Sequence, residues 1–87
     1  KREGDIAEAF ALALGEAQAH LTRREIREGR GEVAKAVRER VKDICGAVTA
    51  GQVDRAIVRG ITLGLLKEQA ATTTGRRSRV EVLPNEQ

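Results

Sequence analysis

The spacing of the apolar residues constrains the fold of this chain more than any other sequence feature. Apolar side chains recur every three or four residues within residues 5–21, 32–48 and 50–71, and this period places them on one face of an α-helix. The clearest stripes are Ile6, Phe10, Ala13, Leu14, Ala17 and Leu21 in the first segment and Val33, Val37, Val41, Ile44 and Val48 in the second. We therefore predict an all-α fold, a small bundle of one short and three longer helices with a short C-terminal extended tail.

Two capping-box patterns set the expected helix boundaries. Residues 22–25 (Thr-Arg-Arg-Glu) and 49–52 (Thr-Ala-Gly-Gln) each place a Thr three residues before a Glu or Gln, so that side chains and backbone amides can satisfy each other at a helix N-terminus. A short helix should run over residues 23–28 and end at Gly29, because glycine readily adopts the left-handed conformation that ends helices. The last helix should run over residues 50–71.

The last predicted helix carries apolar residues around most of its circumference, which predicts that it is the central helix of the bundle. Ala56, Gly60 and Gly64 are spaced four apart and would form a strip of small side chains on which another backbone could pack closely. Two interpretations are open: a tight helix crossing within the chain, or an oligomer seam between subunits.

Residues 1–75 are predicted to form the helical domain and residues 76–87 a basic extended or disordered tail. The tail contains three arginines and then a short alternation of apolar and polar residues before Pro84, which permits one strand that ends at the proline. Disorder and docking onto a partner are the alternatives. The chain begins with Lys1 and contains no Met, which is typical of a processed product or an excerpt of a longer protein.

The composition predicts a small core that a partner subunit would complete. Only 21 of the 87 residues are Ile, Leu, Val or Phe, and 13 more are Ala. A short chain buries a small share of its surface, and no disulfide or metal cluster is available to stabilise it, so a homo-oligomer is expected. Cys45 is the single cysteine, which favours a reducing compartment such as the cytoplasm. No apolar run reaches the roughly 20 residues that span a bilayer, so no membrane association is expected.

The net charge of +3 is distributed unevenly along the chain. Residues 1–21 carry two positive and four negative charges, whereas residues 22–42 carry eight positive and four negative charges. The candidate nucleic-acid-binding residues in this basic segment are Arg23, Arg24, Arg27, Arg30, Lys35, Arg38 and Lys42. Lys35, Arg38 and Lys42 share one face of the helix predicted over residues 32–48 and form a basic ridge, which the four arginines precede. Such a ridge is typical of contact with a phosphate backbone, and the alternative is a solvated face of ion pairs.

The order of the predicted elements in the basic segment resembles a helix-turn-helix in length. A short capped helix, a glycine turn and a longer helix have the scale of this DNA-binding motif. Arg27 and Arg30 depart from it, because they occupy positions where the motif uses a small residue and a core aliphatic residue. The match is one of element lengths and identifies no family.

The chain offers few residues for catalysis, with one His, one Cys, one Ser and no Tyr. His20 lies at the edge of an apolar helix stripe, and Cys45 lies near a helix C-terminus, where the helix dipole disfavours a thiolate. Phe10 is the single aromatic residue and belongs to a core stripe, so stacking on single-stranded nucleic acid is not expected. We expect no enzymatic activity and no bound metal or cofactor.

The sequence therefore predicts a small helical DNA-binding or DNA-associated regulatory protein that contacts phosphates through residues 23–42 and acts as a homo-oligomer. The alternative is a helical protein–protein interaction module, such as an adaptor, scaffold or assembly subunit, whose basic face binds an acidic protein. Salt-dependent retention on duplex DNA, compared with retention by an acidic protein, separates the two.

Overall fold

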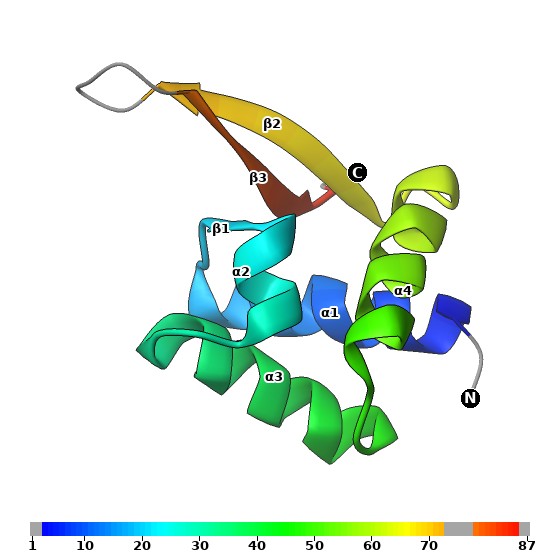
Figure 1. Cartoon of the computed structure of the whole chain (residues 1–87). Coiled ribbons are helices and arrows are strands. Elements are labelled where there is room, and N and C mark those ends of the chain that lie inside the picture. Colours follow the sequence, from blue (N-terminus) through cyan, green and yellow to red (C-terminus); the bar gives the residue numbers. More distant parts are fainter. Residues whose placement is uncertain (1–2, 73–77, 86–87) are drawn as a thin grey trace.

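The computed structural model describes residues 3–72 and 78–85, in which four helices precede two long strands (Figure 1). The elements are α1 (Glu3–Ala17), β1 (Leu21–Thr22), α2 (Arg23–Glu28), α3 (Glu32–Cys45), α4 (Ala50–Thr62), β2 (Leu66–Thr72) and β3 (Ser78–Pro84). The strands form one antiparallel sheet in the order β1-β3-β2. The prediction of an all-α helical bundle is therefore wrong, because the protein combines helices with an antiparallel sheet.

The helix predicted over residues 50–71 ends early because Gly64 stops it. Gly64 has a φ of 78°, its amide donates to the Ile61 carbonyl over 3.1 Å, and the Leu65 amide donates to the Gly60 carbonyl over 2.8 Å. These two bonds form a Schellman motif, which satisfies the last carbonyls of a helix through a left-handed residue. The chain leaves this turn in an extended direction and continues as β2.

Part of the predicted tail, residues 78–84, forms β3, the central strand of the sheet. β3 pairs with β2 along its whole length and with β1, where Val82 lies opposite Leu21. Val82 is buried, and the strand ends at Pro84, the boundary that the strand interpretation of the tail predicted. Residues 76, 77, 86 and 87 of the predicted tail lie outside the described residues.

The central helix is α1, in place of the last helix that the sequence predicted. It packs against α3, α4 and β3, and its Ile6, Phe10 and Leu14 side chains are buried. The other large side chains of the core are Leu21, Ile26, Val37, Val41, Val53, Ile57, Leu66 and Val82. The helices and the sheet therefore share one core, to which every element from α1 to β3 contributes.

Both predicted capping boxes are confirmed. The Thr22 hydroxyl accepts from the Glu25 amide over 3.2 Å, and the Glu25 carboxylate accepts from the Thr22 amide over 2.8 Å. Thr49 and Gln52 form the same pair of hydrogen bonds at the start of α4. Gly29, with a φ of 67°, ends α2 as expected. These caps fix where α2 and α4 begin, and therefore which of their side chains face outward.

Of the three small residues spaced four apart, Ala56 and Gly60 lie on α4 and Gly64 lies in the turn after it. Ala56 and Gly60 are buried. A Cβ atom added to Gly60 would lie 3.0 Å from the Cβ atom of Ala7 on α1 and 2.7 Å from a methyl group of Leu66. The close crossing at Gly60 is therefore formed within the chain, between α1, α4 and the start of β2.

Within residues 3–72 and 78–85, no helix combines the length and the apolar character needed to cross a membrane.

Candidate nucleic-acid interface

The seven cationic residues that the sequence singled out are spread over α2, the turn after it and α3. Four of them form ion pairs: Arg23 with Glu68 at 2.8 Å, Arg24 with Glu28 at 3.0 Å, Arg27 with Asp54 at 3.5 Å and Arg30 with Glu28 at 3.3 Å. Two of these pairs connect separate elements, because Arg27 joins α2 to α4 and Arg23 joins α2 to β2. All four arginines stay partly exposed, so the pairs are weak and a phosphate could replace the carboxylate.

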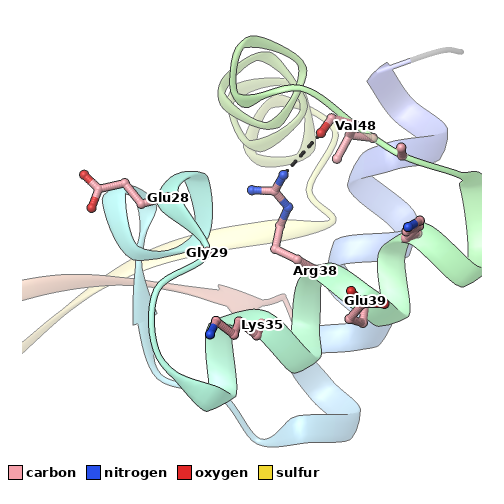
Figure 2. Close-up of a pocket in the computed structure, with 8 residues that line it drawn as sticks. Glu28, Gly29, Lys35, Arg38, Glu39 and Val48 are labelled. Carbon is pink, nitrogen blue, oxygen red and sulfur yellow. Dashed lines mark hydrogen bonds between the residues drawn. The ribbon is translucent and has the colours of Figure 1, made fainter.

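Arg38 of α3 directs its guanidinium into the protein (Figure 2). Its Nη1 atom donates to the carbonyls of Arg27 and Ile26 over 2.8 and 3.1 Å, and its Nη2 atom donates to the Val48 carbonyl over 3.2 Å. Two of the planar donor groups of the side chain are thus committed to backbone acceptors. This leaves Arg38 less free than its neighbours on α3 to bind an external phosphate.

Lys35 and Lys42 line an open groove of about 520 Å³ between the end of α2, α3 and the segment before α4. Glu28 and Glu39 line the same groove, as Figure 2 shows for the labelled side chains. Two ammonium groups and the Arg38 guanidinium therefore share the groove with two carboxylates. The basic ridge predicted on α3 therefore lies on a surface of mixed charge, and not on a uniformly positive one.

A second basic surface, which the sequence did not single out, is the outward side of α4. Arg55, Val58, Arg59 and Thr62 are exposed there, and we call these four residues the α4 face. Arg55 lies 3.6 Å from Glu3, whereas Arg59 forms no ion pair with any side chain in the described residues. Val58 is 51% exposed. The α4 face thus presents two cations and an apolar side chain on one helix, and the carboxylates of Glu3 and Asp54 line the same surface.

The neighbouring elements hold the α4 face in a defined position. The opposite side of α4 is buried against α1 and α2, and Arg27 of α2 pairs with Asp54 at the edge of the face. Ala50 and Gly51, both exposed, begin the helix after the Thr49 cap. The hairpin of β2 and β3 starts at the other end of α4 and projects beyond the helices (Figure 1). The α4 face is therefore rigidly mounted and open to solvent.

The burial pattern of α4 is the signal that could have identified this surface. Val53, Ala56, Ile57 and Gly60 form the buried stripe, and the arginines of the α4 face fall on the opposite side of a helix with 3.6 residues per turn. The predicted helix over residues 50–71 included further leucines, which lie around its whole circumference. The polar side of the shorter helix α4 was therefore not recognised in the sequence.

Arg79 of β3 joins the sheet to the start of α2. Its guanidinium contacts the Glu25 carboxylate and donates to the His20 carbonyl over 3.1 Å. The Arg79 Nε atom lies 3.3 Å from the Oε2 atom of Glu81. The Oε1 atom of Glu81 lies 3.2 Å from the Nδ1 atom of His20. This cluster holds the sheet and α2 in a fixed arrangement beside α4.

The Glu25 carboxylate should make stability depend on pH. The hydrogen bond from the Thr22 amide, assisted by the charge of Arg79, lowers the pKa of Glu25 below 4.5. A carboxyl group whose pKa is lower in the folded state stabilises the fold above its unfolded-state pKa, and this stabilisation is lost as pH falls through the folded-state pKa. We therefore expect the free energy of unfolding of the wild type to decrease below about pH 4.5. The free energy of unfolding of Glu25→Gln should decrease less over the same pH range.

Urea unfolding at neutral pH and at steps below about pH 4.5 measures this effect. Glu8→Gln is the matched control, because Glu8 is exposed on α1 and its substitution should leave the wild-type pH dependence unchanged. If Glu25→Gln loses stability with acid as steeply as the wild type, Glu25 does not contribute to the pH dependence of the free energy of unfolding.

Comparison with known proteins yields no match to a protein-family model, to a curated protein or to a solved structure. In the part of the chain that the structure describes, no group of three or more His, Cys, Asp or Glu side chains is placed to hold a metal ion. Cys45 donates its thiol hydrogen to the Val41 carbonyl over 3.3 Å. The shape and charge of the surface are thus the basis on which function can be inferred.

Proposed function

We propose that the chain is a DNA-binding domain of the helix-turn-helix type, in which α4 is the helix that enters the major groove. α2 packs against α4, α3 is an insertion between these two helices, and the β2–β3 hairpin follows α4 directly, as in the winged form of the motif. The observation that carries the proposal is the α4 face, where exposed Arg55 and Arg59 flank exposed Val58 on a helix whose other side is buried.

The α4 face has chemistry suited to duplex DNA. The major groove is about 12 Å wide and admits an α-helix. Arg55 and Arg59, one turn apart, can bind phosphates or the two acceptors of a guanine edge, and Val58 between them can contact a thymine methyl group. Ala50 and Gly51 at the start of the helix leave room for a phosphate to approach the free backbone amides.

The arginines of α2 extend this surface. Arg23, Arg24 and Arg27 lie on the helix that packs against α4, and the exposed ion pairs of Arg23 and Arg24 can be exchanged for phosphate contacts. Lys35 and Lys42 face the groove beside α3, and we assign them a smaller part in the interface. The proposed DNA contacts therefore centre on α4 and α2.

Binding of a random-sequence duplex, followed by fluorescence anisotropy at stepped salt concentrations, tests the proposal. The logarithm of the affinity should fall linearly with the logarithm of the salt concentration, with a slope of about −0.9 for each phosphate contacted. Polyglutamate serves as the acidic-protein probe and should compete poorly. Binding of the duplex only at millimolar protein concentrations would refute DNA binding.

The second candidate function is that of an interaction module for an acidic protein. It is favoured by the α3 groove, where Lys35 and Lys42 are exposed, and by exposed Leu63 beside the α4 face. Tighter binding to polyglutamate than to the duplex in the same assay would support this candidate over DNA binding.

We also propose that the protein acts as a homo-oligomer in a reducing compartment such as the cytoplasm. Three large apolar residues, Leu12 on α1 and Val33 and Ile44 on α3, are between 42% and 49% exposed, and α1 and α3 pack together, so a second copy could cover them. Cys45 is a free thiol. Light scattering across a dilution series should give a mass above that of one chain, and a monomer at micromolar concentrations would contradict the proposal.

A further inference from the structure

α2 is too short to hold its own position. It has six residues, and isolated helices shorter than about 12 residues are marginal in water. The last carbonyls of any helix also lack partners within that helix. In α2 the carbonyls of Ile26 and Arg27 are supplied with a donor from another helix, the guanidinium of Arg38 on α3.

The same guanidinium reaches the start of α4. Its Nη2 atom donates to the carbonyl of Val48 over 3.2 Å, the contact drawn as a dashed line in Figure 2. Val48 directly precedes Thr49, the N-cap of α4. One side chain therefore connects the end of α2 to the residue before α4.

The base of this connection is firmly held. Val37 and Val41 of α3 are buried, and α3 packs against α1. Gly29 ends α2 in the left-handed conformation, and a Cβ atom placed there would lie 3.8 Å from the Arg38 side chain. Arg38 therefore projects from a packed helix toward the end of α2 and the segment before α4, along the open groove that it helps to line.

We propose that Arg38 is a positioning residue for the DNA interface. By binding three carbonyls from two segments, it sets the position of α4 relative to α2, and hence the direction in which the α4 face meets the major groove. The inference rests on the proposed function. Arg38 would then affect the affinity of the protein for DNA although its own side chain does not contact DNA.

An arginine is needed for this role because of its shape. The guanidinium is planar and presents five donors in a rigid fork, whereas the lysine ammonium is a compact group on a flexible chain. Arg38→Lys keeps the charge but cannot reproduce hydrogen bonds to acceptors on two separate segments. This variant therefore separates positioning from the electrostatic attraction of DNA.

The experiment compares wild type, Arg38→Lys and Arg38→Ala at a temperature where circular dichroism shows each to be folded. Arg40→Lys is the matched control, because Arg40 lies on the same helix and makes an exposed ion pair with Glu16 at 2.9 Å. Two quantities are measured: duplex affinity over a range of salt, and hydrogen exchange of the Gly29 and Val53 amides, which close the end of α2 and the first turn of α4.

We expect Arg38→Lys and Arg38→Ala to bind duplex about tenfold more weakly than wild type with an unchanged salt slope, because no phosphate contact is lost. Exchange of the two amides should be faster in both variants, and Arg40→Lys should match wild type in both measurements. If Arg38→Ala does not fold, Arg38→Lys decides the question.

Two results would overturn the proposal. Wild-type affinity and wild-type exchange in Arg38→Lys would show that the three hydrogen bonds do not position α4. A salt slope flatter by about 0.9 in Arg38→Ala would show that Arg38 contacts a phosphate directly. If wild type does not bind duplex at all, the proposed function fails, and unchanged exchange in Arg38→Lys would then remove the positioning role as well.

Discussion

Replacing Arg55 and Arg59 together by Ala is expected to weaken duplex binding about sixtyfold near 0.1 M salt, because each phosphate contact contributes about 0.9 to the slope of log affinity against log salt. The slope should become flatter by about 1.8. Both side chains are exposed on one side of α4, so their removal should leave the core and the free energy of unfolding unchanged. Anisotropy titrations at several salt concentrations measure both quantities.

The matched control is the double variant Lys35→Ala and Lys42→Ala, which removes the same charge from α3. These lysines line the groove beside α3, which we place outside the main contact surface, so we expect less than about a threefold loss of affinity. If instead the α3 variant loses as much as the α4 variant, with an equally flattened slope, the interface lies on the ridge that the sequence predicted and the assignment to α4 fails.

The largest effect on stability is expected from Gly60→Leu, which should lower the free energy of unfolding by about 3 kcal/mol or more. Even one added Cβ atom meets a Leu66 methyl group at 2.7 Å and the Ala7 Cβ atom at 3.0 Å. Both neighbours are buried and cannot move into solvent. Gly60→Ala should cost about 1–2 kcal/mol, because overpacking outweighs the better helix propensity of alanine.

Gly51→Ala is the control for Gly60, since Gly51 lies on the same helix but is exposed. A Cβ atom there meets only the tip of the Arg55 side chain, at 3.4 Å, and the Thr49 hydroxyl, at 4.0 Å. This substitution should leave stability unchanged or raise it by about 0.5 kcal/mol. Urea denaturation measures all three variants. Equal stability of Gly60→Leu and wild type would show that the crossing is not tightly packed.

The parts of the fold that depend on local sequence were predicted well. The capping boxes at Thr22 and Thr49 are local signals, and both are confirmed, as is the end of α2 at Gly29. β2 was missed because its residues 67–71 (Lys-Glu-Gln-Ala-Ala) favour helix by intrinsic propensity. Pairing with β3, together with the stop at Gly64, overrides that preference. The alternation before Pro84 indicated a strand there, but the local pattern does not show which segment that strand pairs with.

The contacts of the basic side chains were less visible in the sequence for a similar reason. Charge along the chain identified the segment around α2, but a count of charges cannot show which arginines bind carboxylates or carbonyls of distant residues. Arg38 is the clearest case, because its acceptors lie 10 to 12 residues away in sequence. The α4 face could be predicted only once the end of the helix was known, since that end decides which residues share its outer side.

The central place of β3 in the sheet has a consequence for the order in which the protein assembles. β2 and β3 are neighbours in sequence and can pair early, whereas β1 must wait for a partner that is synthesised about 60 residues later, as the contact between His20 and Glu81, 61 residues apart, illustrates. Closing a loop of that length is the slow kind of event in folding. The ribosome therefore releases the four helices before the strand that pairs with both β1 and β2, and the domain reaches its final shape only when β3 has been translated.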